Sequence, residues 1–333
     1  MTTTAPAGRR SSPLGDEDRL TAVAERVSRT VLVVALVVAL VSGLVLPGLL
    51  ADLGPVLLVV AGLLGLPHGA VDHLAWGWAR GDVGRPRSGV VVGYAAAALG
   101  AVGVALVLPV PALLVLIALS AAHFAEGEVA WSRQHPGRGS VGPMPGVAAG
   151  VAIVALPLLA RPDAVRPLLA SLDPALPDLL LQPGLRVTLL AGTALLVVAG
   201  VHAARRSRVR LLELLLVVAV AVVLPPLAAF AVWFAGWHAV RHTARLLALD
   251  PRSTSDLQRG RLRPPLARFA RTAALPCGAA VTGTIALALV VGVQGGLLVA
   301  LLALTVPHTA VVARLGERPA PTSSTGRPAA RAG

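Results

Sequence analysis

The chain alternates between long apolar runs and short polar breaks. Most runs approach or exceed about 20 residues, the length that a helix needs to cross the hydrocarbon core of a bilayer. Proline or glycine pairs mark several of the breaks, as at Pro225 and Pro226. The pattern predicts ten membrane-spanning helices, over residues 30–50, 54–78, 89–109, 111–131, 145–160, 184–203, 211–224, 227–247, 273–291 and 295–314.

The same pattern divides the chain into three parts and predicts an all-α, polytopic integral membrane bundle. Residues 1–29 are polar and mixed in charge, and we expect a cytoplasmic N-terminal segment there. Residues 30–314 form the predicted transmembrane domain, which holds every candidate functional group. Residues 315–333 are rich in Pro, Ser, Thr and Arg and predict a disordered, basic C-terminal tail. Within the domain, residues 164–182 are expected to form a loop with a short interfacial helix.

Composition supports a membrane protein and excludes a nucleic-acid-binding one. The chain is 56% hydrophobic and 14% charged, with a mean hydropathy of +0.78, whereas soluble domains carry about 25% charged residues. The net charge of +13 comes entirely from arginine, since the chain has no lysine. These arginines lie mainly between the apolar runs, where they orient helices in a membrane. We therefore expect a lipid bilayer as partner and no nucleic acid.

The arginines also predict an orientation. Alternate connections are rich in arginine, while those at residues 109–111, 225–226 and 292–295 are nearly uncharged. Arginine-rich connections face the cytoplasm in most membrane proteins. A multi-pass protein of the cell membrane with both termini cytoplasmic is therefore predicted.

The most informative stretch is Trp233–His242, near the end of the eighth predicted span. His238 and His242 are four residues apart, so on a helix their rings project from one face. Two imidazoles at this spacing can hold one metal ion, although histidines at a helix end also occur in the headgroup region.

Other histidines reach the same membrane depth. His68 and His73 end the second predicted span, His123 lies late in the fourth, and His308 lies late in the tenth. All these spans run towards the cytoplasm. Because ionisable groups inside membrane helices are costly and mark function, a shared metal site is predicted. His135 and His202 lie beside arginines in connections and are expected on the surface.

Acidic and aromatic residues beside these histidines suggest further roles. Asp72 and Glu126 are candidates to orient metal-bound imidazoles, or else to pair with nearby arginines. Glu128 is a weaker candidate as a direct ligand, and Arg241 could pair with one of these acids. Trp233, Phe234 and Trp237 cover more than one helix face, so some of them should line a site for a flat, conjugated substrate.

The ligand types leave the metal and the chemistry open. Imidazole suits Zn, Cu, Fe or Ni, and the lone Cys277 argues against thiolate sites. An oxygen-using enzyme that acts on a lipid fits such a site. The alternatives are a His-rich metal or proton-coupled transporter, a bis-His haem protein, and a lipid desaturase or hydroxylase.

The ordered motifs resemble a known family. Gly-Leu-Pro-His68-Gly-Ala-Val-Asp-His73, Ser-Ala-Ala-His123-Phe, Trp237-His238-Ala-Val-Arg-His242 and Pro-His308-Thr-Ala-Val-Val are similar to those of the Brp/Blh family. Its members are bacterial and archaeal membrane β-carotene 15,15′-dioxygenases. The chain has Ala125 where the family usually has glycine.

The resemblance implies a non-haem Fe(II) enzyme that uses O2 to cleave the central double bond of β-carotene into two all-trans retinal molecules. It implies that the iron ligands are His68, His123, His238 and His242, which would be the catalytic centre. His73 and His308 would be nearby helpers. It also implies that retinal is delivered to a rhodopsin.

Overall fold

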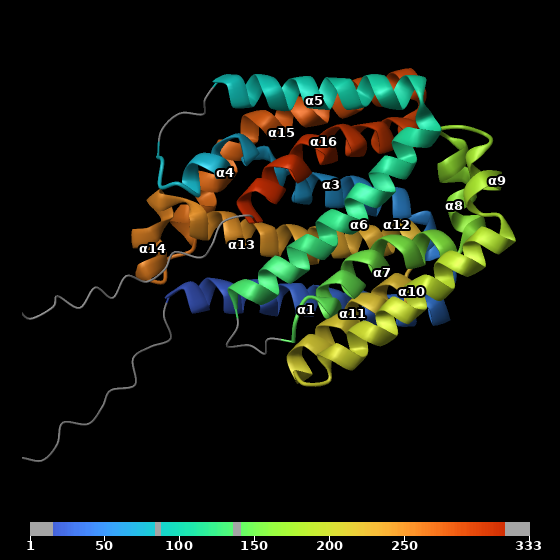
Figure 1. The fold of residues 1–333 in the computed structure, drawn as a ribbon, viewed down its shortest axis with the longest axis horizontal. Helices are drawn as coiled ribbons and strands as arrows, with labels where there is room; N and C mark the ends of the chain where they lie inside the picture. Colours follow the sequence, from blue (N-terminus) through green and yellow to red (C-terminus); the bar gives the residue numbers. More distant parts are fainter. Residues whose placement is uncertain (1–15, 84–87, 136–140, 317–333) are drawn as a thin grey trace, which may run out of the picture.

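A computed structural model describes residues 16–83, 88–135 and 141–316 (Figure 1). Every regular element in these ranges is a helix. In chain order they are α1 (Asp16–Val45), α2 (Leu49–Asp52), α3 (Gly54–Ala70), α4 (Asp72–Trp78), α5 (Ser88–Val107), α6 (Pro109–Gln134), α7 (Met144–Ala160), α8 (Pro162–Ala170), α9 (Leu176–Leu180), α10 (Pro183–Ala204), α11 (Arg208–Val223), α12 (Pro226–Trp233), the π-helix η2 (Phe234–His238), α13 (Ala239–Leu249), the 3-10 helix η3 (Pro251–Ser253), α14 (Thr254–Gln258), α15 (Arg263–Val291) and α16 (Val293–Gly316).

The predicted all-α membrane bundle is confirmed, and fewer than ten of the described helices have the length and apolar composition of a span. Each of the ten predicted ranges falls on a long helix or a run of joined helices. By length and apolar composition, seven of the described helices could cross a membrane, or up to eight if α7 and α8, bent by 92°, count as one broken span. The other two fall short because α11 has only 16 residues and the eighth range is divided among α12, η2 and α13.

Several boundaries differ from the apolar pattern. The first helix begins at Asp16, inside the segment expected to be polar, and α15 begins at Arg263, before the predicted span at 273. Charged residues at these ends lie on helices that continue past the apolar part. The expected loop at 164–182 contains the end of α8 and all of α9. Of the predicted disordered tail 315–333, residues 317–333 lie outside the described residues.

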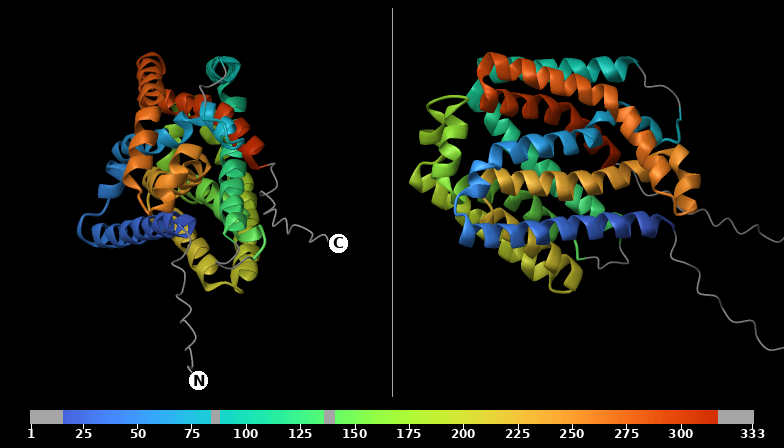
Figure 2. Two further views of the ribbon diagram at one scale, coloured as in Figure 1. Left: turned by 90° about the vertical axis from the view of Figure 1, so that its left-hand side faces the viewer. Right: turned by 180° about the vertical axis from the view of Figure 1, so that it is seen from behind.

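The long helices lie side by side along the long axis of the molecule (Figures 1 and 2). One end of the bundle holds the start of α1, the end of α4, α14 and the end of α16. Described residues beside these helix ends include several arginines, such as Arg80. The short helices α8 and α9 and the α5–α6 connection lie at the opposite end. The arginine-rich connections and the uncharged α5–α6 connection therefore lie at opposite ends of the described fold, and the segment of α8 and α9 carries both arginines and aspartates.

Two glycines bring α7 close to α6. A Cβ atom built on Gly150 would lie 2.2 Å from the backbone nitrogen of Ala125, and one on Gly146 would lie 2.9 Å from that of Val129. Small residues four apart let membrane helices approach closely. Gly150 therefore makes room for Ala125, where the family that the motifs resemble usually has glycine, and it fixes the part of α6 that carries His123.

We expect Gly150→Ala to destabilise the protein by about 1–3 kcal/mol, because the added methyl group meets backbone that cannot rotate away. Gly192→Ala in α10 is the matched control, since its Cβ would meet nothing within 4 Å. Its effect should be neutral or slightly stabilising because alanine favours helices more than glycine by about 1 kcal/mol. Thermal unfolding in detergent measures both. Equal midpoints for the two variants would contradict this description of the α6–α7 contact.

Candidate metal centre

The π-helix η2 carries the central histidine of the site. The chain passes from α12 through one π turn, Phe234–His238, into α13 without leaving the helical rod. Single π turns inside α-helices frequently occur at functional sites because they rotate the following side chains. His238 ends this turn and His242 follows on α13, and their rings stack with centroids 5.9 Å apart and an interplanar angle of 17°. His238 and His242 therefore project from the same face of the helix, as their spacing predicted.

Three further histidines from three other helices converge on this pair. His68 comes from α3, His123 from α6 and His308 from α16. The ring centroid of His68 lies 5.1 Å from that of His238 and 5.0 Å from that of His308. The His123 centroid lies 5.0 Å from that of His238 and 4.7 Å from that of His308. Segments up to 240 positions apart in the sequence thus bring five imidazoles into one cluster.

The five rings are buried, and several of their nitrogens lack a hydrogen-bond partner. Their exposed fractions lie between 4% and 7%. Within the described residues, Nδ1 of His123, Nε2 of His242 and Nε2 of His308 have no partner. Buried polar groups are normally hydrogen-bonded, so each such nitrogen needs an explanation. A metal ion among the rings supplies one.

The distances between nitrogens also fit a metal ion. Nε2 of His123 lies 3.2 Å from Nε2 of His238. Two imidazoles bound to one ion at about 2.1 Å, with an angle of about 90–109° at the metal, place their nitrogens about 3.0–3.4 Å apart. One nitrogen from each of His68, His238 and His308 also lies within 4.8 Å of the other two. The residues present therefore fit a metal ion, and their all-imidazole chemistry suits Fe, Zn, Cu or Ni.

Hydrogen bonds orient two of the rings. Nδ1 of His68 contacts the backbone carbonyl of Gly65, and Nδ1 of His308 lies 2.7 Å from Oδ2 of Asp72. In both cases an Nδ1–H donor leaves Nε2 as the free acceptor towards the cluster. The sequence predicted Asp72 as a residue that orients an imidazole. In the structure Asp72 contacts His308, a histidine of the cluster.

The other polar candidates lie differently. His73 follows Asp72 on α4, is half-buried, and its ring is not among those in contact with the cluster in the described residues. Glu126 is half-buried and interacts electrostatically with Arg245 of α13. His202 is exposed, as expected. His135 is instead partly buried and bonded to Thr21 and to the Trp131 carbonyl.

Aromatic side chains enclose one side of the cluster. Trp233, which is fully buried, stacks over His238 with centroids 5.6 Å apart. Phe234 packs edge-on against His68 and stacks with His238. Phe124, which the sequence did not single out, lies 4.9 Å from the His238 ring. Trp233 and Phe234 thus lie beside the histidines, as expected for an aromatic lining.

Trp237 contacts a buried network of charges instead of this lining. Its Nε1–H donates to Glu128 at 2.7 Å, and the guanidinium of Arg241 lies 3.6 Å from the centroid of its ring. Arg241 pairs with Glu128 at 3.0 Å and with Glu213 at 2.7 Å. The expected pairing of Arg241 with a nearby acid is therefore present. The carboxylate of Glu128 thus contacts Trp237 and Arg241 and not the clustered histidines.

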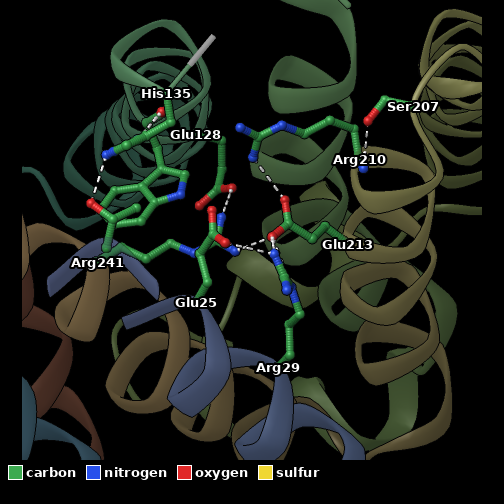
Figure 3. A network of polar contacts seen from close by, with 10 residues as sticks. Glu25, Arg29, Glu128, His135, Ser207, Arg210, Glu213 and Arg241 are labelled. Carbon is green, nitrogen blue, oxygen red and sulfur yellow. Dashed lines mark hydrogen bonds and ion pairs between the residues drawn. The ribbon is translucent and has the colours of Figure 1, made fainter. Parts of the chain in front are cut away.

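Glu213 of α11 is the hub of this network. It accepts contacts from Arg29 of α1, Arg210 of α11 and Arg241 of α13, and Arg29 also pairs with Glu25 (Figure 3). Among the described residues, the ion pairs of this network join these three arginines to Glu25, Glu128 and Glu213. Sequence reasoning missed Glu213. The available signal was a single acidic residue within the seventh apolar run, since a buried charge inside a membrane helix is costly and needs partners.

Known proteins resemble this chain along most of its length. A family described as "Beta-carotene 15,15'-dioxygenase" matches residues 59–316, which include all five clustered histidines. "Probable beta-carotene 15,15'-dioxygenase Blh" of Halobacterium salinarum (strain ATCC 700922 / JCM 11081 / NRC-1) is 31% identical over 237 residues, covering 66% of this chain and 69% of the relative. No solved structure matches the chain.

Proposed function

The chain belongs to the β-carotene 15,15′-dioxygenase family and is a carotenoid-cleaving dioxygenase, and on that premise we propose its substrate, its products and its metal. The substrate is β-carotene, which reacts with O2 at the central 15,15′ double bond to give two molecules of all-trans retinal. The metal is non-haem iron(II). Family membership favours this reaction over the transporter and over the desaturase or hydroxylase.

One observation carries the proposal: five buried imidazoles from four separate helical segments meet inside the residues that match the family. His68, His123, His238 and His242 are the proposed ligands and the catalytic centre. The all-nitrogen donor set is compatible with iron, which the family resemblance implies, and the aromatic side chains beside it suit a conjugated hydrocarbon.

The proposed reaction needs little acid–base chemistry from the protein. The C15=C15′ double bond breaks, two C=O bonds form, and both atoms of O2 end in the two aldehydes, so no proton or external reductant is consumed. A bound iron(II) would supply the activation of dioxygen. The side chains hold the metal, exclude water and position the polyene. Trp233 and Phe234 are the proposed aromatic contacts of the substrate.

The several apolar helices place the protein in a membrane. We propose the cell membrane, with both termini cytoplasmic, because the arginine-rich connections share one end of the bundle. Reporter fusions that fluoresce only in the cytoplasm test this at each terminus, and a dark C-terminal fusion would contradict it. Transfer of retinal to a rhodopsin stays a prediction from the family resemblance.

The test of the reaction is the conversion of β-carotene by the full chain purified in detergent and loaded with Fe(II). We expect oxygen-dependent loss of β-carotene with about two molecules of retinal per molecule consumed, as the 15,15′ position requires. Under 18O2, with each aldehyde reduced to its alcohol as it forms, we expect one labelled oxygen in each product.

Three outcomes would contradict parts of the proposal. Apocarotenals of unequal length would overturn the cleavage position. Label in only one of the two products would overturn the dioxygenase stoichiometry. Intact β-carotene with folded, iron-loaded protein would overturn the substrate. His202→Ala, which changes an exposed histidine outside the cluster, is the control and should react as the wild type does.

A further inference from the structure

His308 occupies a position in the cluster that its predicted role as a helper does not explain. Its ring centroid lies 5.0 Å from that of His68, 4.7 Å from that of His123 and 5.3 Å from that of His242. It also belongs, with His68 and His238, to the group of histidines whose nitrogens lie within 4.8 Å of one another. His308 is therefore inside the cluster and not beside it.

The two ring nitrogens of His308 differ in their hydrogen bonding. Nδ1 lies 2.7 Å from Oδ2 of Asp72, whereas Nε2 is buried and has no partner within the described residues. An Nδ1–H that donates to a carboxylate leaves Nε2 with its lone pair. Metal-bound histidines commonly donate their other N–H to a carboxylate, which fixes the ring and raises its basicity.

The carboxylate is itself held in place. Asp72 is 1% exposed, and the hydroxyl of Tyr94 on α5 donates to the same Oδ2 at 3.3 Å. Tyr94 is the only tyrosine in the chain. Gly69 lies against the pair, because a Cβ built there would be 3.5 Å from Nδ1 of His308 and 3.9 Å from Oδ2 of Asp72. A tyrosine, an aspartate and a histidine from α5, α4 and α16 thus form one buried chain that ends at the cluster.

We propose that His308 is itself a ligand of the metal, and that Asp72 and Tyr94 are the residues that position it. The inference rests on the proposed metal centre and extends its ligand set beyond His68, His123, His238 and His242. Its consequence is that α16, the last described helix, is joined to the centre by a metal–ligand bond. The carboxylate hydrogen bond would make this imidazole a stronger donor than one that donates to a neutral carbonyl.

The test uses Co(II), whose visible absorption reports coordination number, as a probe added to the full-length protein in detergent. Wild type, His308→Ala, Asp72→Asn and Tyr94→Phe are titrated, with His202→Ala as control. We expect wild type and the control to bind one ion with the same spectrum. His308→Ala should bind more than 100-fold more weakly and with an altered spectrum.

The positioning residues have their own expected results. Asp72→Asn should weaken binding about 10–100-fold, since losing an outer partner of a ligating histidine has that effect on metal affinity. Tyr94→Phe should weaken it by a smaller factor, because Asp72 keeps its bond to His308. If His308→Ala does not fold, Asp72→Asn, which preserves the shape of the side chain, decides the question.

The outcomes separate this inference from the proposed centre. Wild type that binds no metal would overturn both. One bound ion whose affinity and spectrum are unchanged in His308→Ala and in Asp72→Asn would overturn the inference and leave the four-histidine centre standing. Weakened affinity with an unchanged spectrum would show that His308 only supports the fold around the other ligands, and would overturn it as well.

Discussion

Replacing His238 with alanine is expected to abolish both iron binding and β-carotene cleavage. His238 contacts both the other histidines and the aromatic lining: its Nε2 faces that of His123 at 3.2 Å, and its ring contacts those of His68 and Trp233. Loss of even an outer partner of a metal ligand costs about 10–100-fold in affinity or activity. Loss of a ligand itself should cost more than loss of its outer partner. We therefore expect iron affinity and cleavage activity each to fall by more than about 100-fold.

The measurement is made in cells that accumulate β-carotene, with pigments extracted and separated by chromatography and with iron measured in the purified protein. Wild-type cells should lose their orange colour and contain retinal, whereas His238→Ala cells should stay orange. His202→Ala, on the exposed surface, should behave as wild type does. Elution as a single species in size-exclusion chromatography shows that the variant is folded. A folded His238→Ala protein that keeps its iron and its activity would remove His238 from the centre.

Most of the fold follows from the apolar pattern, because a bilayer leaves little choice. Backbone polar groups in lipid must be satisfied within a helix, so an apolar run of sufficient length predicts a helix directly. The positions of His68, His123, His238 and His242 follow in the same way, since each falls late in a span that runs towards the arginine-rich end. The helix ends were harder to predict: α1 and α15 continue past their apolar parts into charged residues.

The contacts between helices could not be predicted from the apolar pattern. Nothing in one sequence shows that Asp72 reaches His308, 236 positions away, or that the only tyrosine donates to the same carboxylate. The π turn at Phe234–His238 could not be predicted either, because its sequence is equally compatible with an ordinary α-helix. Trp237 illustrates the effect: it lies one position from His238 but faces Glu128 and Arg241 instead of the cluster.

Removing Arg241 from the buried network is expected to destabilise the protein strongly. Arg241 is 3% exposed and bridges Glu128 of α6 and Glu213 of α11, and its guanidinium lies over the Trp237 ring. In Arg241→Ala, Glu128 loses its only arginine among the described ion pairs, and Glu213 keeps Arg29 and Arg210. Breaking one partner out of a buried ion pair costs about 3–5 kcal/mol because the remaining charge is left uncompensated.

The matched control is Arg166→Ala, which breaks the exposed pair between Arg166 and Asp178 at the opposite end of the bundle. Exposed pairs contribute about 0–1 kcal/mol, so this variant should unfold almost as the wild type does. The double variant Arg241→Met with Glu128→Gln should recover part of the lost stability, because it removes the uncompensated carboxylate together with its partner. Denaturant unfolding in detergent measures all three. If Arg241→Ala and Arg166→Ala unfold alike, the network does not hold α6, α11 and α13 together, and the placement of His238 and His242 must rest on packing alone.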